Sequence, residues 1–365
     1  MLKIAIVGCG KIADDHAAAI QRVRLGKIVA ACDREELMAR QLADRFPVER
    51  IFIDLETMLN AVQPDVVHVT TPPQSHYGIA KQCLAHGCHV YVEKPFTLYP
   101  QEARDLLAIA ESHALKVTAG HDDQFCHVAR RFRKLVREDY LGGPPLHMES
   151  IYGYDLGYGS YAKALLADKQ HWVRKLPGSL LHNIISHGVA RLAEYLQSDS
   201  PRVIAQGFTS PQLRNRGENE LFDELRVMIL EDQRTTAYFT FSSQMRPSLH
   251  QFRAYGSKNG LLLDQDKQLL IRLPGQRYTS YAEQFIPPFG FASQCFINWF
   301  HNMRLFLSND FHPKSGMKYL IDQFYRSIIE NTPPPIPYRE ILLTAVIMDS
   351  IFRQIQPSSE PIPRR

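Results

Sequence analysis

Lys94, Asn183 and His187 are the residues of this 365-residue chain whose types and spacing could do chemistry. Lys94 directly follows the apolar run at residues 89–92, so a lysine stands at the end of an expected strand. An ammonium there can donate a hydrogen bond to a reacting oxygen, and an imidazole with a pKa of about 6.5 can take a proton at neutral pH. Asn183 stands four residues before His187, a spacing that predicts both on one face of a helix. Together they favour proton transfer to or from a bound hydroxyl. The alternatives are a buried core histidine for His187 and a solvated loop lysine for Lys94.

A glycine-rich turn near the start of the chain predicts where a nucleotide binds. It follows a short apolar run and precedes a helical stretch, so its glycines allow a tight turn and a close backbone approach to a pyrophosphate. Asp33 ends the next expected strand, where a carboxylate binds the ribose hydroxyls and repels a 2′-phosphate. NAD is therefore expected over NADP, although Arg34 is able to tolerate that phosphate. The expected cofactor contacts are Gly8, Cys9, Gly10, Lys11, Ile12, Ala13, Asp33 and Arg34; the alternative is a turn that uses glycine for geometry alone.

The order of the elements around these residues predicts two domains. Strand-like runs alternate with helical stretches up to about residue 120, a pattern that indicates a doubly wound parallel sheet. Beyond it, seven runs that alternate apolar and polar residues predict a large, mostly antiparallel open sheet, with helices at 180–196, 291–307, 317–331 and 338–356. The fold class is thus α/β in the first domain and α+β in the second. The expected boundaries are 1–122 for nucleotide binding, 123–356 for substrate binding and oligomerisation, with the last helix able to pack back on the first domain, and 357–365 as a tail.

Composition excludes several other classes of protein. The chain has 42 Lys and Arg against 38 Asp and Glu, and the two signs are interspersed, so no basic surface for nucleic acid or an anionic membrane is expected. Apolar runs are too short for a transmembrane helix or a signal peptide, which favours the cytoplasm. Six scattered cysteines fit a reducing compartment.

A small group of metal-ligating residue types is better explained by structure than by a metal. Cys83, His86, Cys88 and His89 surround Gly87, which has the place of a helix end before a strand. Ligands so placed would point in different directions. We therefore expect no metal.

Further motifs resemble a known family. Thr70-Thr71-Pro72-Pro73 with His76, then Glu93-Lys94-Pro95, and the stretch at 178–187, stand in the order and spacing of the glucose-fructose oxidoreductase and inositol dehydrogenase family, Gfo/Idh/MocA. The resemblance implies a Rossmann domain, a second domain with an open sheet, a sugar, polyol or sugar nucleotide between them, and a homodimer or homotetramer formed through the sheet face. It also implies a cis Lys94–Pro95 bond. Lys94, Asn183 and His187 match its catalytic positions, and the cofactor contacts gain Thr70, Thr71, Pro72, His76, Glu93 and Lys94.

Two departures from the family pattern concern the substrate. The family's usual Asp is Asn183 here, and an amide would position His187 or a hydroxyl without exchanging a proton. Asp122 lies in a segment where the family often has Asn and Arg. The expected substrate contacts are Lys94, Asp122, Tyr154, Trp172, His182, Asn183 and His187, while sheet packing remains the alternative for the aromatic residues and a core position for His182.

These observations predict an NAD-dependent dehydrogenase that transfers hydride between nicotinamide and a secondary alcohol of a sugar, polyol or sugar nucleotide. His187 is the expected base, and Lys94 is expected to stabilise the developing alkoxide. Two alternatives stay open. One is a glycosidase of the same fold that uses NAD without net redox change, and the other is a non-catalytic sensor of sugar or dinucleotide.

Overall fold

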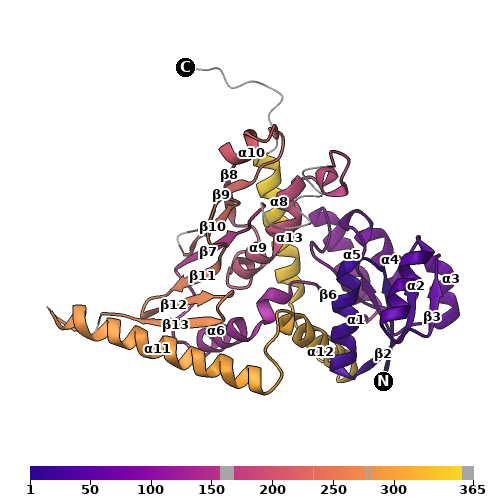
Figure 1. Ribbon diagram of the computed structural model, residues 1–365, viewed down its shortest axis with the longest axis horizontal. Helices are drawn as coiled ribbons and strands as arrows, with labels where there is room; N and C mark the ends of the chain where they lie inside the picture. Colours follow the sequence, from indigo (N-terminus) through magenta and orange to yellow (C-terminus); the bar gives the residue numbers. More distant parts are fainter. Residues whose placement is uncertain (157–167, 233, 277, 280, 356–365) are drawn as a thin grey trace.

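The computed structural model describes residues 1–156, 168–232, 234–276, 278–279 and 281–355 and contains two sheets with helices packed around them (Figure 1). The first sheet has six parallel strands in the order β3-β2-β1-β4-β5-β6. Its order reverses between β1 and β4, which places a ligand crevice at the carboxyl ends of these strands. The doubly wound parallel sheet is confirmed. Its strands are β1 (Leu2–Val7), β2 (Gly26–Cys32), β3 (Arg50–Phe52), β4 (Val66–Val69), β5 (His89–Val92) and β6 (Val117–Ala119).

Helices cover this sheet, so its central strands are mostly apolar and buried. All four residues of β4 are buried, for example. Local signals set the helix starts: Asp54 accepts a hydrogen bond from the backbone N–H of Thr57 at 2.8 Å, and Pro100 occupies the first turn of its helix. The helices are α1 (Lys11–Val23), α2 (Glu36–Arg45), α3 (Leu55–Val62), α4 (His76–Ala85) and α5 (Pro100–Ser112).

The second sheet has seven strands in the order β13-β12-β11-β7-β10-β9-β8. Its neighbouring strands pair antiparallel except β7 and β10, which pair in parallel, so the prediction of a mostly antiparallel sheet is confirmed. Buried and exposed residues alternate along β10, because one face of the sheet meets the core. The strands are β7 (His147–Gly153), β8 (Arg202–Phe208), β9 (Glu224–Leu230), β10 (Thr236–Ser242), β11 (His250–Tyr255), β12 (Asn259–Asp264) and β13 (Leu269–Pro274).

Two helices of this half differ from the prediction. The helix expected at 180–196 is divided at Ile185 into α8 (Ser179–Ile184) and α9 (Ser186–Ala193). The helix expected from residue 291 is α11 (Ala282–Leu307), which begins earlier and includes Pro287 and Pro288. No helix among the described residues is long and apolar enough to cross a membrane. The others here are α6 (His127–Arg137), α10 (Pro211–Arg214), α12 (Ser315–Ile329) and α13 (Tyr338–Ile355).

The last two helices join the two halves of the molecule. Leu320, Phe324 and Tyr325 of α12 are fully buried in the core of the first sheet. α13 runs between the two sheets (Figure 1), with Ile341 in the first core and Ile347 in the second. Because α12 belongs to the core of the first sheet, we propose that the nucleotide-binding domain is completed by this late segment. The expected tail at 357–365 lies outside the described residues.

Candidate functional site

Lys94 lies at the carboxyl end of β5 and reaches across to the second domain. Its Nζ donates a hydrogen bond to the backbone carbonyl of Asn183 at 3.0 Å, and its backbone N–H donates to Glu93 Oε2 at 3.0 Å. The Lys94–Pro95 peptide bond is cis, as the resemblance implied. The contact brings two of the three expected catalytic positions together from elements 89 residues apart in sequence.

The break between α8 and α9 corrects the expectation of one continuous helical face. Asn183 lies on α8 and His187 on α9, with Ile185 between the two helices. In an unbroken helix the carbonyl of Asn183 would accept from the N–H of His187, but here it accepts from the Lys94 ammonium. A long-range hydrogen bond therefore accompanies the break, and the four-residue spacing alone could not reveal it.

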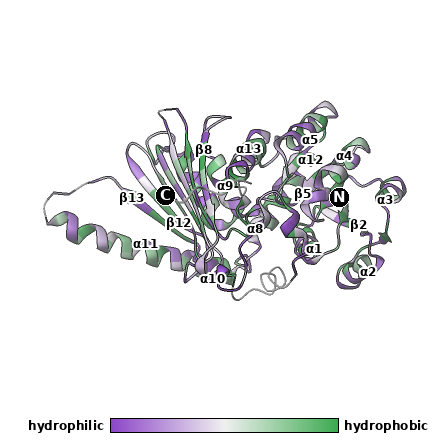
Figure 2. Cartoon of the chain, turned by 90° about the horizontal axis from the view of Figure 1, so that it is seen from above, coloured by the Kyte–Doolittle hydropathy of each residue, from purple (hydrophilic) through white to green (hydrophobic). Residues whose placement is uncertain are grey.

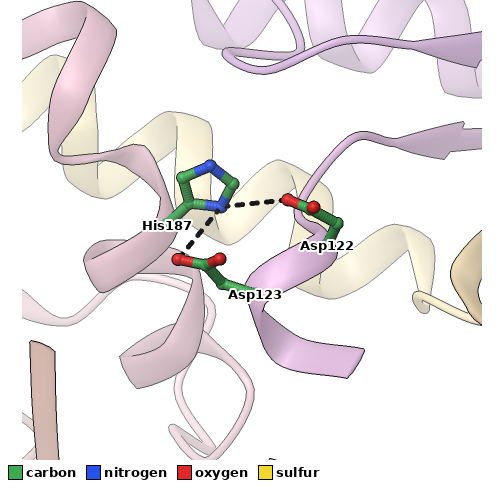
Figure 3. A group of neighbouring side chains, drawn as sticks. All are labelled: Asp122, Asp123 and His187. Atoms are coloured by element: carbon green, nitrogen blue, oxygen red, sulfur yellow. Dashed lines mark ion pairs between the residues drawn. The ribbon is translucent and has the colours of Figure 1, made fainter. Parts of the chain in front are cut away.

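Asp122 and Asp123 surround the ring of His187 (Figure 3). Nδ1 of His187 lies 3.9 Å from Asp122 Oδ1 and 3.8 Å from Asp123 Oδ2. Both distances are slightly longer than a hydrogen bond. Asp123 is held from the other side, because the hydroxyl of Tyr152 donates to its Oδ2 at 2.9 Å and Arg191 donates to its backbone carbonyl at 2.8 Å. The arrangement fixes Asp123 and leaves Asp122 and His187 to face each other.

Their surroundings move the pKa values of these three groups apart. Burial lowers the pKa of His187 to about 4, although the Asp123 carboxylate opposes this shift. Burial and then the negative charge of Asp123 raise the pKa of Asp122 to about 7. Burial would also raise the pKa of Asp123, but the charges of His187 and Arg191 outweigh it and lower that pKa. Near neutral pH the group that titrates is therefore Asp122, whereas the sequence alone favoured His187.

A chain of buried hydrogen bonds fixes the carboxylate next to Lys94. His16 Nε2 lies 2.9 Å from Glu93 Oε1, His16 Nδ1 lies 2.8 Å from His68 Nδ1, and His68 Nε2 lies 2.7 Å from the hydroxyl of Tyr325. One proton arrangement satisfies every contact with neutral rings: Tyr325 donates to His68, His68 donates to His16, and His16 donates to the Glu93 carboxylate. We call these four residues the buried relay.

The buried relay makes a charged carboxylate tolerable in the protein interior. Burial alone would raise the pKa of Glu93, but the hydrogen bond with His16 and the charge of Lys94 lower it to about 2. Burial also keeps the pKa of His68 well below its ordinary value, so this ring is neutral. Glu93 in turn accepts the backbone N–H of Lys94, so the relay positions the segment that carries the lysine.

The glycine turn combines one position that needs glycine with open space at the start of α1. Gly8 has φ +92°, and a Cβ there would lie 2.6 Å from Cγ2 of Thr71, so this position needs glycine for packing. A Cβ on Gly10, in contrast, would meet no atom within 4 Å. Gly10 directly precedes α1, so open space remains at the helix N-terminus, where phosphate binds.

The other expected cofactor residues surround this turn. Asp33 Oδ2 accepts the backbone N–H of Cys9 at 2.7 Å, which places the carboxylate at the end of β2. Thr70 donates through Oγ1 to the carbonyl of Gly8 at 2.6 Å. His76 is buried with its two ring nitrogens 2.9 and 2.8 Å from the carbonyls of Pro95 and Thr71, and burial lowers its pKa. Of the remaining members, Ala13 is buried, Ile12 is half-buried, and Lys11, Arg34 and Pro72 are exposed.

Three expected substrate contacts lie apart from the cluster around His187. His182 is 1% exposed, stacks on Phe352 with ring centroids 4.5 Å apart, and has its pKa lowered by burial to about 4. Tyr154 and Trp172 pack against a small third core around Leu180. His182 therefore has the buried position that was its alternative, while its contact with a substrate stays a prediction.

The residue types that could hold a metal also gather in a different place from the cysteine group. Cys83 and Cys88 are buried, and burial raises the pKa of each thiol. Among the described residues, Asp122, Asp123 and His187 instead offer three ligand-type atoms within 4.8 Å of one another. A divalent cation and a proton would compete for this cluster.

Sequence reasoning missed several residues of this region. Asp123 follows Asp122 directly, and a pair of carboxylates after a strand end was an available signal. His16 lies on α1, about one helical turn after the glycine-rich turn. His68 interrupts the apolar run of β4. A histidine in a fully buried strand is the signal that could have indicated a polar partner.

The shift of Asp122 predicts how stability depends on pH. In the unfolded chain its pKa is about 3.9, so its contribution is fully present below that pH and is lost as the pH rises through about 7. Asp122→Asn should therefore raise Tm relative to the parent protein near pH 8, by roughly several degrees, and change it little near pH 4. Differential scanning calorimetry at both pH values checks this, with the exposed Asp232→Asn as control. An equal change in Tm at the two pH values contradicts the assignment.

The buried relay predicts the effect of removing one hydroxyl. Tyr325→Phe leaves Nε2 of His68 buried without its donor, so the free energy of unfolding should fall by about 1–3 kcal/mol. Tyr319→Phe on the same helix is the matched control and should change it by less than about 0.5 kcal/mol. Urea unfolding of both variants provides the measurement. Equal stability of Tyr325→Phe and the parent protein would show that the relay does not form.

Comparisons with known proteins extend these observations. The model of the Gfo/Idh/MocA oxidoreductase family, with an NAD-binding Rossmann fold, matches residues 2–121. D-Glucoside 3-dehydrogenase of Escherichia coli K12 is 32% identical over 142 residues, which is 39% of this chain and 40% of that protein. D-Apiose dehydrogenase of Paraburkholderia graminis is 27% identical over 142 residues, 39% of this chain and 38% of that protein. The chain thus spans about two-fifths of the length of these curated relatives.

Solved structures match over almost the entire fold. The WlbA dehydrogenase of Bordetella pertussis, in complex with NADH and UDP-GlcNAcA, has a TM-score of 0.77 at 14% identity and covers 100% of this chain and 98% of its own. UDP-N-acetylglucosamine 3-dehydrogenase of Acidithiobacillus ferrooxidans has a TM-score of 0.73 at 15% identity, with 97% and 98% covered. At such identities the likeness shows the fold. The first third of the chain, residues 2–121, is thus similar to the NAD-binding domain of the Gfo/Idh/MocA oxidoreductases, and the whole chain has the fold of dehydrogenases of known structure.

Proposed function

We propose that this protein is an NAD-dependent dehydrogenase that oxidises a secondary alcohol of a sugar, polyol or sugar nucleotide, or catalyses the reverse reduction. The observation that carries the proposal is the contact of Lys94 Nζ with the Asn183 carbonyl, which brings the end of β5 to the helices that carry Asn183 and His187. Lys94 follows β5 and the glycine-rich turn follows β1, so both lie at the edge formed by the carboxyl ends of the parallel strands. Hydride chemistry requires this arrangement of a cofactor crevice and proton-transferring side chains.

The fit of a dinucleotide rests on the turn itself. The space beside Gly10 and the start of α1 would receive the pyrophosphate, and Asp33 would receive the ribose. Bound NAD supplies a carbon that accepts the hydride. The residues that would hold it are those of the turn, together with Thr70, Thr71 and the Lys94 segment.

The proposed proton path uses the side chains around His187. Lys94 would donate a hydrogen bond to the substrate oxygen and stabilise the developing alkoxide. His187 would take the hydroxyl proton and share it with Asp122, whose carboxyl lies 3.9 Å away and has its pKa raised to about 7. Asp123, fixed by Tyr152 and Arg191, would stabilise the imidazolium that forms. Asn183 would orient the substrate through its amide.

Names of relatives support a sugar-type substrate. D-Glucoside 3-dehydrogenase and D-apiose dehydrogenase both act on sugars according to their names, and the Bordetella structure contains a sugar nucleotide. The relative named 2,7-anhydro-N-acetylneuraminate hydratase, which is 27% identical over 138 residues, favours keeping a redox-neutral reaction as the second candidate. We further propose a homo-oligomer as the working form.

The proposed function predicts NADH formation that depends on Lys94. Purified protein with NAD should produce near-ultraviolet absorbance with at least one member of a panel of glucosides, inositols and UDP-sugars. Lys94→Ala should lower kcat by about a hundredfold or more, because an oxyanion donor is lost. The exposed Lys27→Ala is the matched control and should retain the rate.

Two results of this experiment would count against a dehydrogenase. If sugar is released or converted without NADH, the redox-neutral reaction takes its place. If NAD binds and no member of the panel reacts, the result favours the non-catalytic sensor of sugar or dinucleotide.

The position of Asp33 predicts the cofactor preference. The carboxylate repels a 2′-phosphate, so the parent protein should bind NAD more tightly than NADP. Asp33→Ser should weaken NAD binding and move the ratio of the two dissociation constants toward NADP by roughly tenfold, about 1.4 kcal/mol. Calorimetric titration with each nucleotide measures the ratio. Tighter binding of NADP by the parent protein would contradict this assignment.

A further inference from the structure

The long helix α11 presents most of its large apolar side chains to solvent and three amide side chains to the protein. Eleven large apolar residues of this helix are exposed, among them Phe289 and Leu307 at 79%. Asn298, in contrast, is 3% exposed. Figure 2 shows α11 along the outer side of the second sheet. The exposed residues are Phe285, Ile286, Phe289, Phe291, Phe296, Ile297, Trp299, Phe300, Met303, Phe306 and Leu307.

The polar face of α11 completes the edge of the second sheet. Gln294, Asn298 and Asn302 stand four residues apart and so share one side of the helix. Asn298 accepts from the backbone N–H of Leu270 at 3.0 Å and donates to the carbonyl of the same residue at 2.8 Å. Gln294 pairs in the same way with both backbone groups of Arg272, at 2.8 and 3.1 Å.

These bonds fix which side of the helix faces out. β13 is an edge strand, and its outward N–H and C=O groups need partners that a strand would otherwise supply. The side-chain amides take that place, and rotation of α11 to bury its aromatic residues would break these bonds. The amide hydrogen bonds to β13 therefore keep the apolar face of α11 directed toward solvent.

The exposed apolar area is larger than a monomer ordinarily carries. If a fully exposed side chain of this size offers about 200 Å², the eleven residues expose roughly 1,300 Å². The largest apolar patch on a typical monomer is about 300–600 Å², whereas a stable interface buries about 800 Å² on each partner. The helix alone has the area that one side of a dimer interface requires.

A groove beside the helix could receive side chains from a facing molecule. It has a volume of about 560 Å³ between α6, β13 and α11. Its lining includes apolar Leu135, Tyr140, Leu270 and Ile297 beside charged Arg131, Lys134, Glu138 and Arg272. Ile297 belongs both to this lining and to the exposed face of α11. In a twofold dimer the same surface faces its own copy, so the ridge of one copy can face the groove of the other.

We propose that α11 is the interface through which two copies of this chain form a homodimer. The aromatic face of each α11 packs against the other, and large side chains of one copy enter the groove of its partner. This surface differs from the sheet face that the family resemblance implied for oligomers. A lipid surface is disfavoured as the occupant, because Arg304 is the one Lys or Arg on α11 and interfacial helices are rich in both.

The mass of the full chain in solution tests the interface. Size-exclusion chromatography with light scattering, at micromolar protein, should give at least twice the 41.8 kDa of one chain. Phe289→Asp combined with Trp299→Asp should halve the measured mass while leaving the circular dichroism spectrum unchanged. Leu37→Asp, which changes an exposed apolar helix residue of the first domain, is the matched control and should keep the mass of the parent protein.

Other outcomes overturn the proposal. A parent protein that is monomeric at this concentration excludes the dimer. An unchanged mass in the folded double variant places the oligomer interface elsewhere, as on the sheet face. Co-sedimentation of monomers with vesicles of phosphatidylcholine and phosphatidylglycerol in equal parts assigns α11 to a membrane surface instead. Because none of these readouts involves NADH, they are independent of the proposed reaction.

Discussion

The hydrogen bond from Lys94 to the carbonyl of Asn183 is the contact on which the candidate site depends. It joins the carboxyl end of a parallel strand to a helix of the second domain. The carbonyl that it uses lies where the helix divides into α8 and α9, so the same contact accompanies the turn that places His187 beside Asp122 and Asp123. Position of the lysine and position of the imidazole are thus coupled through one backbone oxygen.

The buried relay explains how Lys94 is held on the other side. A carboxylate in an apolar interior is unfavourable unless hydrogen bonds satisfy it, and Glu93 has His16 and the backbone of Lys94 as partners. The relay continues through His68 to Tyr325 on α12, a helix that follows the second sheet in sequence and packs in the first core. The late segment of the chain therefore contributes directly to the segment that carries the lysine. Charge and packing in the site depend on both halves of the molecule.

Much of the fold could be predicted from the sequence, because its signals are local. Alternation of strands and helices up to residue 120 predicted the parallel sheet. The edge strand β3 was not predicted, and none of its three residues is fully buried. The division of the helix at Ile185 could not be predicted, since it coincides with a hydrogen bond from Lys94. The pairing of Asp122 with His187 could not be predicted either, because the pKa values of both groups depend on burial and on neighbours from other elements. His68 contradicted the apolar pattern of its strand and was the available sign of the relay.

The central claim is that hydride passes between the substrate carbon and NAD at the Lys94 site. The most direct measurement uses a substrate found in the panel, labelled with deuterium on the carbon that is oxidised, and follows the label by mass spectrometry of the nucleotide. Deuterium recovered in NADH, together with slower turnover of the labelled substrate, is the predicted result. Deuterium that stays in the sugar product, with no labelled NADH formed, would contradict net dehydrogenation.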